Sequence, residues 1–532
     1  MRKKIILYVI LIFSSVSILA QEKNTGQAIE LPDFVITGIQ SVTVPILDKK
    51  KSAFIHIISP EFLQPNYDTE EFSLLDNSNP IKQEMEIKSL LENYNGLLQI
   101  GAGTQTLPIG RLSFGINKKD ILFNSHLFGI NTGNYVPYSS YNASGAEIKL
   151  NYFVNHNAGI FKGLSIGLEG DFLRDKYNFY GSNNPLRLRE NENYNGKFFI
   201  SSKLNKNYNY GLNFGSNITN LKTDGIYENL LNAQGYFEYK FSTISLGTKG
   251  EYKIQKINAN LNGYGRADFF EGSVYLRLSN SKIFDLKLGA QYSQLDTNSL
   301  FSPIAVLSIF VEEGVAMFIS YEGKADLITY NKFKSENLYF ENDYTNIYQQ
   351  QYSNMKVIIK YDFSDIFELN AGFYSSSFDN YHYYEDVNGD NKFNIQLMNE
   401  VEETGGFINL TINAKEYGEL FANVEFQSVT DSANFKIPYK PLFIGDLSYG
   451  YSFNFGLYTK VKLNYSHLSY TNLANTKQLP DYINFSMLFK YSLFKSFALT
   501  CSLENILNRD DYLLKNYLEK PQDIIVGIEY KW

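Results

Sequence analysis

The sequence predicts an all-β fold, a transmembrane antiparallel β-barrel of about 22 strands within a range of roughly 16 to 22. Three observations predict it. Aromatic residues make up 16% of the 532 residues, almost all of them tyrosine and phenylalanine, although the mean hydropathy is only −0.26. From Leu98 onward, apolar and polar residues alternate repeatedly. Clusters of Asn, Gly, Asp and Ser, which are typical of turns, separate these segments, and helical periodicity is almost missing.

Residues 1–20 are expected to be a secretory signal peptide. A basic start (1–4) precedes an apolar run (5–19), and cleavage is expected after Ala20. A retained transmembrane helix is the weaker interpretation, because the run has about 15 residues and a spanning helix needs about 20. Cleavage would lower the basic count from 48 to 45 against 56 acidic residues, for a net charge of −11. This charge argues against nucleic acid as a partner.

Residues 21–97 differ in texture from the rest of the chain. They contain five prolines and a basic run at 49–51, and they lack regular alternation. We expect a short periplasmic segment here that could act as a stopper, followed by the barrel at 98–532. Each predicted strand with its connection takes about 20 residues, which suits tilted membrane strands better than propeller blades.

The alternation also assigns the two faces of the predicted strands. In 284–292, FDLKLGAQY, aromatic and aliphatic residues share one parity, and charged or small polar residues share the other. A soluble sandwich alternates as well, so strand number and length support the membrane interpretation. A basic residue at the bilayer midplane costs about 2–4 kcal/mol. The charged face is therefore expected to line the lumen, and the apolar face to meet lipid, with aromatic residues at the rims.

The connections between predicted strands alternate in length. Segments 205–209 and 279–283 are tight turns, whereas 330–351 and 381–399 are long. Outer-membrane barrels have short turns on the periplasmic rim and long loops outside the cell. The sequence therefore predicts a multi-pass barrel in the lipid of a bacterial outer membrane.

The chain ends in 523–532, DIIVGIEYKW, whose last residue is its only tryptophan. Strict alternation predicts a strand that closes the barrel against the first one. Its lipid-facing residues are expected to be Ile524, Val526, Ile528, Tyr530 and Trp532, and Asp523, Gly527, Glu529 and Lys531 should face the lumen.

Several segments resemble the barrel of a TonB-dependent receptor. Residues 503–508, LENILN, together with Tyr512, are similar to a turn signature in the late strands of that family. Residues 97–116 are similar to its first barrel hairpin, and 523–532 to its closing strand. The resemblance implies binding or uptake of a nutrient. It also implies that the terminal aromatic strand is the signal that the outer-membrane assembly machinery reads.

Residues 29–38, IELPDFVITG, resemble the segment that such receptors offer to TonB, the energy transducer. An extended segment can bind by adding its backbone to the edge of a partner's sheet. The alternative is a periplasmic strand or linker. The candidate TonB-binding residues are Glu30, Leu31, Phe34, Val35, Ile36, Thr37 and Gly38.

The chain departs from that family at its N-terminal end. The family's plug takes well over a hundred residues, whereas 21–97 supply 77 and contain none of its motifs. Barrels of about 22 strands have a plugged lumen. Either a separate plug chain fills the lumen, or residues 21–97 together with inward loops fill it, or the barrel has fewer strands than expected. The resemblance also implies an energising partner of the TonB type. The alternative function is a non-transporting scaffold or surface-attachment barrel.

One loop resembles a calcium site in its spacing. Asp386, Asn388, Asp390 and Asn394 occupy positions 1, 3, 5 and 9 of a calcium-binding loop. The alternative is a solvated turn rich in Asn and Asp, because position 6 is Asn391 rather than glycine. No other cofactor is expected. The five histidines have no catalytic or metal-binding spacing, so the sequence predicts no enzymatic activity.

Overall fold

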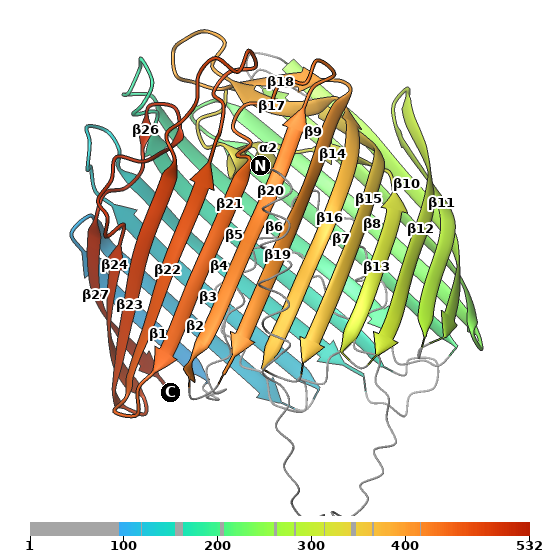
Figure 1. Cartoon of the computed structure of the whole chain (residues 1–532), viewed down its shortest axis with the longest axis horizontal. Helices are drawn as coiled ribbons and strands as arrows, with labels where there is room; N and C mark the ends of the chain where they lie inside the picture. The colour runs from blue at the N-terminus through green and yellow to red at the C-terminus, as the bar shows by residue number, and fades with distance from the viewer. Residues whose placement is uncertain are drawn as a thin grey trace, which may run out of the picture. The chain divides into compact units, whose positions relative to one another are not determined.

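A single antiparallel sheet closes on itself in the computed structural model (Figure 1), because β1 pairs with both β2 and β27. The sheet has 23 strands. Of these, β13 and β14 pair with successive parts of β15 and share one position, which leaves a barrel of 22 strands. The predicted all-β barrel is confirmed. The structure describes residues 95–118, 120–154, 163–202, 207–259, 263–280, 283–312, 314–341, 347–363, 366–414 and 417–532.

The first half of the barrel strands comprises β1 (Gly96–Gly103), β2 (Thr106–Lys118), β3 (Ile121–Thr132), β4 (Tyr141–Phe153), β5 (Leu164–Asn178), β6 (Leu188–Ser202), β7 (Tyr208–Leu221), β8 (Ile226–Phe241), β9 (Ile244–Ala259), β10 (Gly263–Asn280) and β11 (Phe284–Leu295). The second half comprises β12 (Asn298–Glu312), β13 (Val315–Glu322), β14 (Lys324–Ile328), β15 (Ile347–Phe363), β16 (Phe367–Asp379), β19 (Val401–Asn413), β20 (Glu419–Thr430), β21 (Phe443–Ser452), β22 (Leu457–His467), β23 (Tyr482–Phe494), β24 (Phe497–Glu504) and β27 (Asp523–Lys531). Outside the barrel sheet lie α2 (Tyr330–Glu336) and two small hairpins, β17 (Tyr381–Glu385) with β18 (Asn394–Met398) and β25 (Tyr512–Leu514) with β26 (Tyr517–Leu518).

The two faces of the strands follow the predicted parity. Val274 and Leu288 are 58% and 49% exposed on the outer face, whereas Gln291 and Ser293 are buried on the lumen side. An apolar face turned outward and a polar face turned inward is the pattern of a barrel surrounded by lipid. Within the described ranges, no helix is long and apolar enough to span a membrane.

The two ends of the barrel carry different connections. Turns such as 242–243 and 495–496 lie at one end, where β27 also finishes. The connections of 329–341 and 380–400, together with α2, β17 and β18, lie at the other end (Figure 1). The predicted alternation of short turns and long loops is therefore confirmed, and the end with the long loops is the outer end.

The closing strand β27 is hydrogen-bonded on both sides, to β24 and to β1. Trp532 continues this pairing beyond the strand, because its backbone N–H donates to Gly96 and its carbonyl accepts from Gly96, each at 3.1 Å. The indole also covers Gly96, where an added Cβ would lie 2.1 Å from the ring. Glycine at this position therefore makes room for the terminal aromatic side chain, which stacks on Tyr530 at 5.8 Å.

Candidate functional site

The long connections at the outer end pack against one another. We call them together the outer cap, defined as residues 133–140, 179–187, 222–225, 329–341, 380–400, 431–442, 468–481 and 505–522. One buried apolar cluster joins Phe333, Phe340, Phe393 and Tyr517 from three of these connections to residues at the strand ends. Apolar side chains buried between connections hold the outer cap together as a packed layer rather than as separate loops.

The helix α2 is anchored to the inner wall of the barrel. Its N-cap residue Thr329 accepts a hydrogen bond from the Lys332 N–H through its side chain. The Glu228 carboxylate on β8 accepts from the Tyr330 N–H at 3.0 Å. Lys334, which is buried, pairs with the buried Asp175 on β5. These contacts fix the connection 329–341 against strands distant in sequence.

Buried ion pairs tie three connections of the outer cap together. Arg189 is fully buried, and it donates to Asp224 at 2.7 Å and to the Leu338 carbonyl at 3.1 Å. Its guanidinium carbon also lies 4.7 Å from the Phe179 ring centre and 4.5 Å from the Phe340 ring centre. Burial alone would raise the pKa of Asp224, but the neighbouring arginines outweigh burial and lower it. The carboxylate therefore stays charged and holds the loops.

Further contacts reach the connection between β24 and β27. Lys515 Nζ lies 3.0 Å from Asp386, and the Tyr517 hydroxyl donates to the Asn391 carbonyl at 3.0 Å. Glu385 accepts a hydrogen bond from the Leu473 N–H at 3.0 Å. Segments more than a hundred residues apart thereby form one surface at the outer end.

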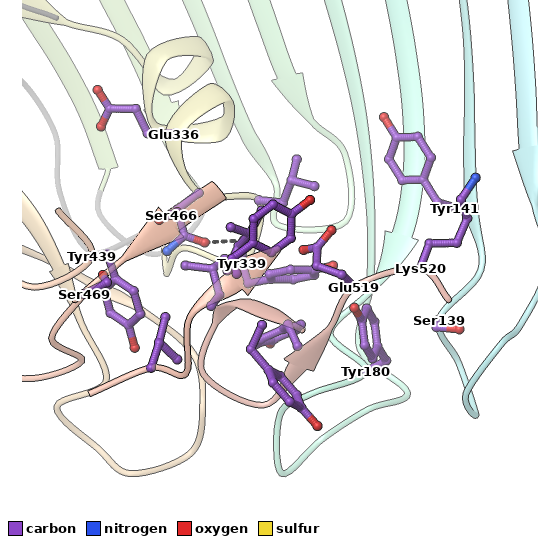
Figure 2. A pocket seen from close by; sticks show the side chains of 18 of the residues that line it. Ser139, Tyr141, Tyr180, Glu336, Tyr339, Tyr439, Ser466, Ser469, Glu519 and Lys520 are labelled. Atoms are coloured by element: carbon purple, nitrogen blue, oxygen red, sulfur yellow. Dashed lines mark hydrogen bonds between the residues drawn. The ribbon is translucent and has the colours of Figure 1, made fainter. Parts of the chain in front are cut away.

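A cavity of about 500 Å³ lies among these connections (Figure 2). Its walls come from six connections of the outer cap and from neighbouring strand ends. Nine of its 27 lining residues are tyrosines, among them Tyr135, Tyr180, Tyr339, Tyr482 and Tyr517. The volume lies within the range of about 300–1,000 Å³ that is typical of small-molecule pockets. We call this cavity the tyrosine pocket.

The tyrosines of the pocket are held in place by one another. The Tyr135 and Tyr180 hydroxyls lie 3.1 Å apart, and both donate to the Leu518 carbonyl, at 3.0 and 2.7 Å. Tyr339 stacks on Tyr517 with ring centres 3.6 Å apart, and the Tyr180 ring meets Tyr517 edge-on at 5.2 Å. Burial raises the pKa of Tyr180, so its hydroxyl stays neutral. The pocket wall is thus preorganised and mostly uncharged.

Three of the four acidic or basic lining residues lie in ion pairs. Lys520 Nζ lies 2.6 Å from Glu504 and 2.9 Å from Asp523, and these contacts raise its pKa against the effect of burial. The remaining two pairs are His467 with Asp481 at 2.6 Å and Glu336 with His382 at 2.8 Å. Burial would raise the pKa of Glu336, but the neighbouring His382 outweighs it and lowers the pKa.

Glu519 differs from these residues. Among the residues that the structure describes, none pairs with or donates a hydrogen bond to the Glu519 carboxylate. Burial, reinforced by the nearby Asp511 carboxylate, raises the pKa of Glu519 to about 7. In Figure 2, Glu519 occupies the middle of the lining, and Lys520 extends away from it toward Tyr141.

The predicted calcium-site residues lie in the connection between β16 and β19. Asp386 pairs with Lys515, and Asp390 lies 2.6 Å from Lys392 Nζ. Asp386 also accepts from the Asn391 N–H at 3.1 Å, the contact of an Asx-type turn. No group of three or more His, Cys, Asp or Glu placed to hold a metal occurs in the described part of the chain. The calcium site stays a prediction.

The other predicted site residues have different outcomes. The TonB-like residues Glu30 to Gly38 lie outside the described residues. In the closing strand, the five residues of the apolar parity are 40–58% exposed on the outer face, whereas Asp523 and Glu529 are buried. Their role as an assembly signal stays a prediction.

Sequence reasoning missed the tyrosine pocket. The sequence shows the long connections and the richness in tyrosine, and it places Tyr512 in a turn signature. No local pattern indicates that Tyr135 and Tyr180 contact Leu518, because Leu518 lies more than 300 residues after both tyrosines in the chain.

No family model and no curated protein matches this chain. Solved structures do match. The FrpB iron transporter from Neisseria meningitidis aligns with a TM-score of 0.63 at 11% identity, over 84% of this chain and 82% of that one. The siderophore receptor PiuA from Acinetobacter baumannii aligns with a TM-score of 0.61 at 14% identity, over 83% and 82%.

A third similar structure is the ferric-catecholate import receptor Fiu from Escherichia coli K12. It has a TM-score of 0.59 at 11% identity, over 83% of this chain and 82% of that one. At these identities the likeness shows the fold. The chain therefore has the β-barrel fold of these siderophore receptors and of this iron transporter, and the resemblance to a TonB-dependent receptor barrel is confirmed at the level of fold.

Proposed function

We propose that this protein is an outer-membrane receptor that captures a nutrient in the tyrosine pocket and takes it up through the barrel. The observation that carries the proposal is a cavity of about 500 Å³, walled by six packed connections at the outer end of a closed barrel. The fold shared with receptors for siderophores and with an iron transporter supports the same function.

The capture step would use the outer cap. Its connections pack through buried aromatic rings and ion pairs, so the pocket is formed before a ligand arrives. A preformed pocket loses less conformational entropy on binding than flexible loops would lose. Neutral tyrosine hydroxyls would orient the ligand by hydrogen bonds, and the ring faces would cover its apolar parts.

The passage step would need a stopper and a source of energy. Barrels of this strand number are plugged, because an open lumen of about 22 strands would leak. Residues 21–97, a separate plug chain or both would close the lumen. The outer membrane holds no ATP, so a periplasmic TonB-type transducer would supply the work. The best contact candidates are in 30–38, where an extended segment would add to the transducer's sheet edge.

Deleting residues 21–95 is expected to raise the single-channel conductance of the purified barrel in planar bilayers. The full chain should conduct little, because the deleted segment would occupy the lumen. The matched control is the full chain with Glu400→Gln, an exposed change in the outer cap that should leave conductance unchanged. Low conductance in both the full and the shortened chain would contradict the stopper role. It would favour the alternative of a non-transporting scaffold.

A further inference from the structure

The charged residues of the tyrosine pocket disfavour anionic ligands. Its one lysine is tied to Glu504 and Asp523, and His467 is tied to Asp481. Neither Lys520 nor His467 is available to an anionic ligand without breaking an existing pair. Arginine is missing from the lining residues. A pocket for a carboxylate-rich or catecholate ligand would need free cationic donors, which the described lining does not offer.

The one lining charge without a described counter-ion is negative. Glu519 lines the same cavity as Tyr135, Tyr180 and Tyr482. A second carboxylate, Asp511, is close and buried, and its nearest cation, Arg509, is 3.6 Å away. An uncompensated carboxylate in a partly desolvated pocket costs folding free energy. A ligand that supplies the missing positive charge would offset this cost.

The aromatic lining strengthens the preference for a cation. Tyrosine ring faces carry a negative electrostatic potential, and a cation within about 6 Å of a ring centre is attracted to it. Glu519 and nine tyrosines line the same cavity, so a cation paired with Glu519 would also meet aromatic surface. The carboxylate and the rings act in the same direction.

We propose that the tyrosine pocket binds an organic cation, a ligand that presents an ammonium or guanidinium group to Glu519 among the tyrosine rings. This inference rests on the proposed receptor function and specifies its substrate class. A short basic peptide is one ligand of this class, because its lysine side chains present ammonium groups. The remaining tyrosine hydroxyls then hydrogen-bond to the peptide's amide groups.

The test measures binding of Nα-acetyl-trilysine amide to the full chain in detergent by titration calorimetry. The comparison probe is the same peptide acetylated at its side-chain amines, which keeps the length and removes the charge. We expect the charged peptide to bind at least about tenfold more tightly, the effect of one charged hydrogen bond. Glu519→Gln should remove about tenfold of that affinity. The matched control Glu400→Gln changes the net charge equally but lies exposed outside the pocket, and should leave the affinity unchanged.

Proton competition gives a second readout. The pKa of Glu519 is raised to about 7, so its charged form increases between pH 6 and pH 8. Affinity for the charged peptide should increase over this range in the natural protein and stay flat in Glu519→Gln. The other groups that face Glu519 are Asp511, Tyr135, Tyr180 and Tyr482, while Lys520 and His467 remain tied to their acids. These groups are unchanged in Glu519→Gln, so any pH dependence of the affinity that remains in this variant would come from them.

Three outcomes would overturn the proposal. The charged and acetylated peptides could bind equally well, or the natural protein and Glu519→Gln could bind the charged peptide equally well. Glu400→Gln could also lose as much affinity as Glu519→Gln, which would indicate attraction to the acidic surface alone. Failure here is distinguishable from failure of the receptor function. A barrel that opens on deletion of 21–95 yet shows any of these outcomes contradicts only the ligand class.

Discussion

Arg189→Met is expected to destabilise the outer cap by about 3 kcal/mol, the lower end of the range for breaking a buried ion pair. The change keeps most of the side-chain volume but removes the charge that Asp224 faces at 2.7 Å. It also removes the donor to the Leu338 carbonyl and the cation between the Phe179 and Phe340 rings. Arg187, at 3.0 Å, still pairs with Asp224, and therefore the lower end is expected.

Amide hydrogen exchange in detergent would measure this loss at residues 179–187, 222–225 and 338–341. Protection there should fall by about two orders of magnitude, while the barrel strands stay protected. Arg174→Met is the matched control, because Arg174 is 48% exposed and pairs with Glu190 on the neighbouring strand. Exposed pairs contribute about 0–1 kcal/mol, so its effect should be small. Equal protection in the two variants would show that the Arg189 pair does not hold the outer cap.

Val274→Lys is expected to destabilise the whole barrel by about 2–4 kcal/mol. Val274 is 58% exposed on the outer face of β10, with Thr248 and Ala290 as its cross-strand partners. A lysine ammonium at this position would meet lipid, which offers no hydrogen-bond partners, unless the side chain bends toward a rim.

Equilibrium unfolding by urea from lipid vesicles would measure this change. The control is Gln234→Lys on β8, which introduces the same charge on the lumen face opposite Glu251. That lysine gains a carboxylate neighbour and stays in a polar environment, so its effect should remain within about 1 kcal/mol. A Val274→Lys variant as stable as Gln234→Lys would contradict the assignment of the outer face to lipid.

The barrel could be predicted from the sequence because its signal is local and repeated. Side chains at successive positions of a strand point to opposite faces, so 284–292 alone shows which parity meets lipid. The number of strands followed from the spacing of turns. The break between β13 and β14 could not be predicted, because it is visible only in how both pair with β15.

The pocket could not be predicted because its parts meet only through the fold. Leu518 accepts hydrogen bonds from tyrosines 383 and 338 positions earlier in the chain. Glu519 gave no sequence signal, since one acid among 56 has no distinguishing local pattern. Its significance lies in the absence of a described counter-ion, which depends on where Lys520 and the loop carboxylates point.

Photo-crosslinking from Val35 in living cells tests whether a periplasmic transducer energises uptake through this barrel. A photoreactive residue at this position in the TonB-like segment should yield a covalent product with a TonB-type transducer. The same residue at Tyr530, on the lipid-facing parity of β27, should not. We therefore expect a transducer adduct from Val35 and none from Tyr530. No transducer adduct from Val35, in a protein that reaches the outer membrane normally, would contradict it.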